Sequence, residues 1–348
     1  MNSNRIAWMD FARFFAMATV VALHTTDQLM MAHRDLSELQ WSAYQIFRII
    51  GRTGVPIFLM ISGALVLPKI GSIGVLNFYK KRIPQFFLVL IFYFYATNIF
   101  ISFIHGAEFK FSDLEYKIFH GDMSHAYQLW FMFTIIGLYF VAPFIGRMLS
   151  VLSTKETFIY LALCLIAYYL PVSQGIIFGS QPFYTLFNGE FLGTYLAYFV
   201  IGYLIHNRDV AKNISAWALA TMLLASIAAM LYIQHYLKSI GALEHGEGFT
   251  WYNSVGIFIV SSLLFSLLSK IKDSSIAFAS KPLNYLSASS FCVYLFHLMP
   301  LEVFLMMPAM KNHSVLLSAA MIACSTYLCC LVFYAALHKI KYVRKLVI

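Results

Sequence analysis

The first long apolar stretch of the sequence carries three ionisable side chains, Asp10, Arg13 and His24. Charged groups are costly inside a membrane helix, so each is a candidate functional group. In an α-helix, Arg13 and His24 are separated by about 1100° of rotation and about 16 Å along the axis, which places both side chains on one face. A cation and an imidazole at two depths in the membrane would suit a long ligand. The cation would bind its anionic head, and the imidazole would meet the reactive end that reaches inward.

Two other interpretations of this helix stay open. Arg13 could reach out to the lipid headgroups along its aliphatic stem, and His24 could hydrogen-bond a neighbour without any role in chemistry. Asp10 lies one helical turn before Arg13, so we expect the carboxylate and the guanidinium to pair.

Two further groups of cations are candidates for binding an anion. Arg48 and Arg52 open the second apolar stretch at helical spacing. Arg48 is expected to anchor that helix at the membrane interface, whereas Arg52 is either an anchor or a ligand for a negative charge. Lys80, Lys81 and Arg82 in NFYKKRIPQ indicate a cytoplasmic segment. A contact from Arg82 to a phosphate is an additional possibility.

The segment ASSFCVYLFH places Tyr294 and His297 one helical turn apart, so the phenol and the imidazole can lie side by side. His297 is either structural or part of one site with His24, which is expected at a similar depth. Glu190, just before the sixth stretch, either contacts a sugar hydroxyl or is a solvated loop carboxylate.

Several other kinds of site do not fit the sequence. It contains no Walker A loop, GxGxxG, GxSxG or HExxH pattern, and the pair His120 and His125 lacks the further ligands of a metal site, so we predict no metal. The net charge is +9, but most of the Lys and Arg residues are spread over six predicted cytoplasmic segments and do not form one basic domain, which argues against nucleic-acid binding. The basic tail HKIKYVRKLVI can also attract anionic lipid headgroups.

The composition predicts the elements that must position these groups. Apolar residues make up 61% of the chain and charged residues 11%, where about a quarter is usual in soluble proteins. The apolar residues form blocks of roughly 18–25, long enough to cross a bilayer as helices, and only helices satisfy their own backbone there. We therefore predict an all-α bundle of about ten transmembrane helices, forming a single membrane domain over residues 1–348 with no soluble domain.

The predicted spans are Ile6–Met31, Ile46–Leu67, Ile83–Ile104, Tyr127–Leu149, Thr157–Leu170, Phe191–Ile205, Ile214–Tyr236, Trp251–Leu268, Leu283–Met306 and Val315–Leu337. The inner segments of this scheme hold sixteen Lys and Arg residues and the outer ones five, so both termini are expected in the cytoplasm.

Five phrases of the sequence, in order, resemble those of the acyltransferase-3 family of membrane O-acyltransferases. Arg13 and His24 match its signature of an arginine, ten residues and a histidine. VPIFLMISG, FYKKRIPQ and YQLWFMFTIIGLYFVAPFI are similar to the phrases that follow. The late motif SxSxxVYLxH matches ASSFCVYLFH at Ser290, Tyr294 and His297, with Ala288 in place of its first serine. The layout looks most like the enterobacterial common antigen O-acetyltransferase branch.

The resemblance implies a multi-pass enzyme of the bacterial inner membrane. Acetyl-CoA would be its co-substrate and a hydroxyl of a lipid-linked or cell-surface glycan the acceptor. His24 would be the general base or a transient acetyl carrier. The resemblance also implies that Arg52 or Tyr294 stabilises the oxyanion and that His297 orients the acceptor or transfers a proton. Donor binding would fall to Arg13, Asp10 and Arg82. Acceptor binding would fall to Glu190, Trp130 and Ser290.

Two rival functions place polar groups in membrane helices as well. A secondary transporter or flippase of a small anionic or glycolipid substrate would need broken helices in corresponding halves of the chain, and the sequence does not indicate such a pair. A membrane sensor or scaffold without catalytic activity would not need Arg13, His24 and His297 together.

Overall fold

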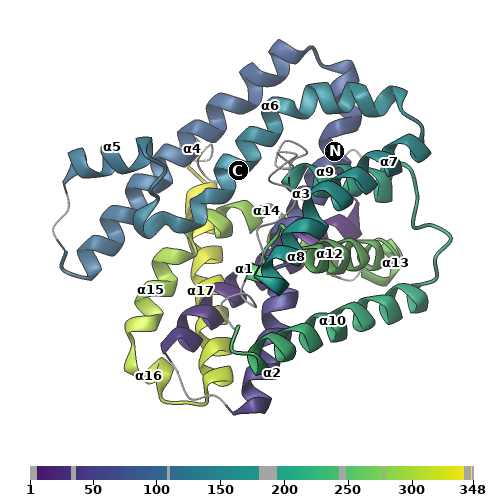
Figure 1. Ribbon diagram of the computed structural model, residues 1–348. Helices are drawn as coiled ribbons and strands as arrows, with labels where there is room; N and C mark the ends of the chain where they lie inside the picture. Colours follow the sequence, from purple (N-terminus) through teal and green to yellow (C-terminus); the bar gives the residue numbers. More distant parts are fainter. Residues whose placement is uncertain are drawn as a thin grey trace. The chain divides into compact units, whose positions relative to one another are not determined.

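The computed structural model describes residues 6–32, 37–107, 110–179, 194–242, 248–276, 279–340 and Leu346. Within these ranges the regular structure is entirely helical and contains no strand (Figure 1). The all-α fold class predicted from the apolar blocks is therefore confirmed.

The longer helices, in chain order, are α1 (Ala7–Ala32), α2 (Glu38–Gly51), α3 (Gly54–Val66), α4 (Val75–Ile104), α5 (Phe111–Phe119), α6 (Trp130–Val151), α7 (Thr154–Cys164), α8 (Leu170–Phe178), α9 (Thr194–Asn207), α10 (Ala216–Ser239), α12 (Val255–Leu268), α14 (Ser280–Phe296), α15 (Leu298–Met306) and α17 (Val315–His338). Short turns are η1 (Leu67–Ser72), η2 (Ser124–Leu129), the π-helical η3 (Leu165–Tyr169), α13 (Asp273–Ile276) and α16 (Pro308–Lys311). Each of the ten predicted spans overlaps one of these helices or a broken pair of them.

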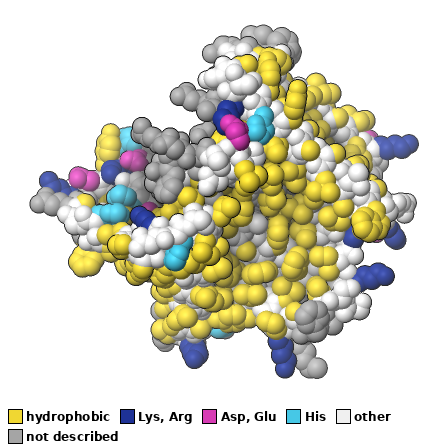
Figure 2. Space-filling model, turned by 90° about the horizontal axis from the view of Figure 1, so that it is seen from below, with side chains coloured by type: hydrophobic (Ala, Val, Ile, Leu, Met, Phe, Trp, Pro, Cys, Tyr) yellow, Lys and Arg dark blue, Asp and Glu magenta, His cyan; other side chains and the backbone are white. Residues whose placement is uncertain are grey.

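The chain is a polytopic membrane protein. Six helical segments of the described residues are long and apolar enough to cross a membrane, and a seventh is added if α14 and α15 form one bent span. Many large hydrophobic side chains are exposed at the surface (Figure 2). On α10, Trp217 is 85% exposed and Leu224 67% exposed, as expected of a surface that lipid covers. The count of ten spans and the cytoplasmic termini stay predictions.

Two helical boundaries differ from the predicted spans. The third predicted span begins at Ile83, but α4 begins at Val75, so Lys80, Lys81 and Arg82 lie within its first two turns. The predicted outer loop before the fourth span contains the helix α5. Its single buried residue, Leu114, gives too short an apolar pattern to be recognised in the sequence.

The chain divides into two compact units whose segments alternate along the sequence. The first unit comprises Met1–Thr19, Asp35–Val75 and Val141–Ser280, and the second Val20–Arg34, Leu76–Phe140 and Lys281–Ile348. The prediction of a single membrane domain is not tested by this division.

In the first unit, α3 and α9 are in backbone contact through two glycines. A Cβ atom on Gly63 would collide with the backbone of Phe199, and one on Gly202 would collide with the backbone of Met60. Small residues allow membrane helices to approach this closely, and close packing is a main source of their association. The two glycines therefore hold α3 and α9 together.

In the second unit, α14 and α15 meet at a bend of 66°, with His297 between them. Pro300 lies in the first turn of α15, lacks an N–H and crowds the carbonyl four residues earlier, which explains the break. Beyond the bend, Leu298 and Leu301 form a buried cluster with Leu29 of α1 and with Ala319 and Ile322 of α17. This cluster fixes the second half of α1 beside the bend.

Candidate active site

The second unit brings three rings from distant parts of the sequence together. The ring centroids of His24 and His297 lie 5.3 Å apart, with their planes inclined by 30°. The ring of Tyr127 lies 5.5 Å from that of His24, in an edge-on orientation. His24 is half-buried and His297 is fully buried. The predicted proximity of the two histidines is thus present in the structure.

Two backbone carbonyls near the end of α14 determine which nitrogen of His297 carries the proton. Nδ1 faces the backbone carbonyls of Tyr294, at 2.8 Å, and of Val293, at 3.1 Å. A carbonyl oxygen only accepts hydrogen bonds, so the neutral ring must bear its proton on Nδ1 and its lone pair on Nε2. Among the described residues, Nε2 is buried and has no hydrogen-bond partner. His297 therefore offers a basic nitrogen within the site.

Two reciprocal contacts hold the end of α14 against η2. The phenol of Tyr294 donates to the carbonyl of Gln128 at 2.8 Å, and the side-chain amide of Gln128 donates to the carbonyl of Leu295 at 3.2 Å. The ring of Phe131 packs edge-on against Tyr294 at 5.5 Å. Tyr294 therefore positions the turn that carries His297. The oxyanion role predicted for Tyr294 would require its hydroxyl to leave the Gln128 carbonyl.

Tyr127 and Gln128 are the site residues that the sequence analysis missed. The amide of Gln28 on α1 donates to the Tyr127 hydroxyl at 3.4 Å, which links η2 to the helix that carries His24. The amide oxygen of Gln128 is buried and has no hydrogen-bond partner among the described residues. The only signal in the sequence was their place in the phrase YQLW, directly before Trp130.

This arrangement can perform acid–base chemistry. Imidazole is the side chain whose ordinary pKa allows it to take up and release a proton near neutral pH. Two imidazoles with centroids 5.3 Å apart can contact the same small group, such as a hydroxyl held between or beside them. Nε2 of His297 and the amide oxygen of Gln128 are buried acceptor atoms without a hydrogen-bond partner among the described residues, so each can receive a hydrogen bond from a donor group.

The first unit contains the predicted ion pair on α1. Nη1 of Arg13 donates to a carboxylate oxygen of Asp10 at 3.2 Å, which confirms the expected pairing. Asp10 is buried, whereas the side chain of Arg13 is 31% exposed and therefore partly accessible to a ligand. Arg13 can therefore bind an anion while Asp10 holds its orientation.

The first unit also contains Arg48 and Arg52, both buried. The guanidinium of Arg52 lies 4.3 Å from the ring centroid of Trp251 and 5.7 Å from that of Tyr252. The guanidinium of Arg48 lies 5.4 Å from the ring of Tyr44. Both cations are thus stabilised by aromatic faces. A buried guanidinium does not fit the role of interfacial anchor that we expected of Arg48.

The remaining predicted residues lie in separate surroundings. Arg82 is exposed on α4. The hydroxyl of Ser290 is buried and donates to the carbonyl of Leu286 at 2.8 Å. Trp130, at the start of α6, is half-buried beside Phe131, with ring centroids 5.9 Å apart. Glu190 lies outside the described residues.

Comparison with known proteins identifies the family. A family model described as an acyltransferase domain matches residues 6–335. The chain belongs to the acyltransferase-3 family. Searches of curated proteins and of solved structures find no match.

Membership of the acyltransferase-3 family gives the histidine cluster a chemical context. The family match includes segments of both compact units and all the candidate residues named above. The chain is therefore a multi-pass membrane acyltransferase. Every acyl transfer to a hydroxyl requires a group that removes the hydroxyl proton, and the second unit supplies imidazoles suited to that task.

Proposed function

We propose that this acyltransferase is an O-acetyltransferase of the bacterial inner membrane. It transfers an acetyl group from cytoplasmic acetyl-CoA to a hydroxyl of a lipid-linked or cell-surface glycan. The motif layout, with HTT at the end of the first arginine–histidine signature and NGE before the sixth span, supports the enterobacterial common antigen O-acetyltransferase branch. The observation that carries the proposal is the contact between the imidazoles of His24 and His297.

In the proposed reaction, the acceptor hydroxyl attacks the thioester carbonyl of acetyl-CoA. His24 accepts the hydroxyl proton as the new C–O bond forms. The C–S bond then breaks, and the CoA thiolate leaves and takes up a proton from the imidazolium. In a second form of the mechanism, His24 carries the acetyl group transiently before the hydroxyl attacks. Both forms need a neutral imidazole at position 24.

His297 and Gln128 have supporting roles in this proposal. With its proton on Nδ1 directed at the Tyr294 carbonyl, His297 presents Nε2 as an acceptor. The acceptor hydroxyl can donate to Nε2 or to the amide oxygen of Gln128, which would orient it for attack. We also assign acceptor contacts to Ser290, Trp130 and Glu190, and oxyanion stabilisation to Arg52 or Tyr294.

Donor binding is assigned to Arg13, with Asp10 as its orienting partner. The side chain of Arg13 is 31% exposed and is therefore partly accessible to a ligand. Guanidinium groups bind phosphate through paired, charge-assisted hydrogen bonds. Arg82 is exposed on α4 and is a second candidate for a CoA phosphate.

The test uses the full chain in lipid nanodiscs, with acetyl-labelled acetyl-CoA and an extract of lipid-linked glycans. We expect label to appear in the glycan fraction and free CoA to accumulate in equal amount. In cells, mass spectrometry of surface glycans should show an acetyl increment that is lost without the gene and restored by the wild-type chain, but not by His24→Ala. Acetyl-CoA turnover without any acetylated glycan would reject the proposed acceptor.

A further inference from the structure

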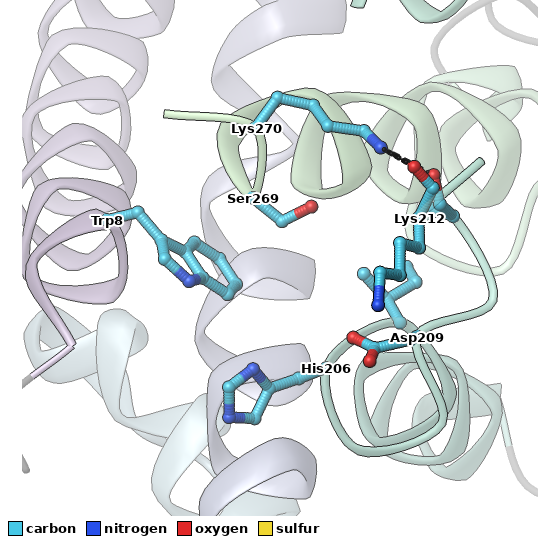
Figure 3. A pocket seen from close by; sticks show the side chains of 8 residues that line it. Trp8, His206, Asp209, Lys212, Ser269 and Lys270 are labelled. Atoms are coloured by element: carbon cyan, nitrogen blue, oxygen red, sulfur yellow. Dashed lines mark hydrogen bonds between the residues drawn. The ribbon is translucent and has the colours of Figure 1, made fainter. Parts of the chain in front are cut away.

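The first unit contains a cavity of about 470 Å³ that the proposed chemistry leaves unused. Trp8 of α1 lines one side, and the opposite side is formed by the end of α9, the loop that follows it and the end of α12 (Figure 3). The labelled lining residues are Trp8, His206, Asp209, Lys212, Ser269 and Lys270. Cavities of this size usually accept a small molecule of several functional groups.

Lys270 joins two of the segments that line this cavity. Its ammonium donates to the backbone carbonyls of Ala211, at 2.6 Å, and of Lys212, at 2.8 Å. These bonds tie the loop after α9 to the end of α12. Within the loop, Asp209 adopts a left-handed backbone, with φ of 52°, and its carbonyl accepts from the Lys212 N–H at 2.9 Å. The loop that carries Lys212 is therefore held in place by main-chain contacts.

The cavity combines positive charge with an aromatic wall. The exposed Lys212 extends toward His206 and Asp209, and Lys270 has a third N–H beyond its two carbonyl partners (Figure 3). The indole of Trp8 is held edge-on by His206, at 5.9 Å, and Phe265, at 5.2 Å. Cations bind phosphate esters, whereas an indole presents a surface to a planar base.

We propose that this cavity binds the nucleotide end of coenzyme A. Lys212 and Lys270 contact its phosphate esters, the adenine lies against Trp8, and the carboxylate of Asp209 accepts a hydrogen bond from an amino or ribose hydroxyl group. This assignment rests on the proposed function, in which acetyl-CoA is the donor. A lone phosphate or a lipid headgroup would leave much of the 470 Å³ and the indole unused.

The predicted topology is consistent with this ligand. Lys212 and Lys270 belong to the segments that the charge bias assigns to the cytoplasm, where coenzyme A is available. Trp8 and Arg13 both lie in the first two turns of α1. The same end of this helix therefore carries a wall of the cavity and the guanidinium assigned to the donor.

The test is a calorimetric titration of the full chain in neutral-lipid nanodiscs with adenosine 3′,5′-bisphosphate. Lys212→Ala should weaken the affinity for the bisphosphate about fivefold or more, because a partly solvated contact between two charges contributes about that factor. Lys212→Glu should weaken this affinity further. The matched control is Lys155→Ala, which removes an exposed cation at the start of α7 in the same unit. Pantetheine, which lacks phosphates and nucleotide, should bind Lys212→Ala and wild type equally.

Two sets of results separate this inference from the proposed function. Equal nucleotide affinity in Lys212→Ala and Lys155→Ala would overturn the cavity assignment even if acetyl transfer is observed. The assignment would also fail if Lys212→Ala changed only the binding of phosphatidylglycerol, measured in separate nanodiscs that contain this anionic lipid. Nucleotide binding that depends on Lys212, in a protein that acetylates no glycan, would retain the assignment and reject the proposed acceptor chemistry.

Discussion

The ring of His24 on α1 lies 5.3 Å from the ring of His297 at the break between α14 and α15. α1 and the junction between α14 and α15 thus meet through these two histidines. Nδ1 of His297 faces the backbone carbonyls of Val293 and Tyr294, so Nε2 is the ring nitrogen that can accept a hydrogen bond from a substrate. We therefore expect different effects from replacing His24 and from replacing His297.

Replacing His24 by alanine should abolish acetyl transfer while the protein still inserts and folds. Loss of a general base lowers the rate by about 10²–10⁴-fold. The measurement is label transfer from acetyl-CoA, with folding checked by gel filtration and thermal unfolding. His120→Ala is the control, because that imidazole is exposed and stacks on Tyr116. Wild-type activity in folded His24→Ala protein would reject the mechanism.

Two substitutions of His297 distinguish a structural role of this side chain from a chemical one. His297→Asn keeps an N–H donor for the Tyr294 carbonyl but removes Nε2. We expect near-normal stability and activity lowered by about 100-fold. His297→Ala also removes the Nδ1–H donor that faces the buried carbonyl of Tyr294, which should lower the free energy of unfolding by about 1–3 kcal/mol. Full activity of His297→Asn would show that Nε2 takes no part in acetyl transfer.

Arg13 should affect donor binding without affecting proton chemistry. Arg13→Lys keeps the charge but loses the planar fork, so CoA should bind more weakly than to wild type, and Arg13→Ala should bind it most weakly. His24→Ala should bind CoA nearly as wild type does, because His24 meets only the reactive end. Calorimetric titration with CoA measures this order. If all four proteins bind CoA equally, Arg13 is only a membrane anchor paired with Asp10.

Gly202→Ala should destabilise the first unit. The added methyl group would meet the backbone of Met60, which cannot move without separating α3 from α9. Overpacking of this kind costs about 1–3 kcal/mol and should lower the unfolding temperature. Gly137→Ala is the matched control, because a Cβ atom there meets nothing within 4 Å. A Gly202→Ala protein as stable as wild type would show that α3 and α9 tolerate a wider separation.

The predicted topology places Ser112–His125 and Leu243–Thr250 outside and both termini inside. Single cysteines at Asp113 and Lys339, both exposed, test it in a background without the native cysteines. An impermeant thiol reagent applied to intact cells should label Asp113→Cys and spare Lys339→Cys. The opposite pattern would reverse the orientation derived from the sixteen-to-five distribution of cations.

The sequence alone was sufficient to predict the long apolar helices, but not the short helix α5. Each apolar block must satisfy its backbone internally in lipid, so length and composition locate a helix without knowledge of its neighbours. The pair of Asp10 and Arg13 was predictable for the same reason, since it depends only on helical spacing. Phrases shared with the acyltransferase-3 family selected His24 and His297 among the eleven histidines.

Tertiary structure alone decided which groups meet. The contact between His24 and His297 depends on the packing of α1 around Leu29 and Leu298, and on the bend after α14, where Pro300 breaks the helix. Tyr127 and Gln128 carry no charge, so nothing in an apolar segment marks them until the fold places them at the site. The cavity near Trp8 likewise forms only where the ends of α9 and α12 approach α1, because cavities arise between elements and no local pattern encodes them.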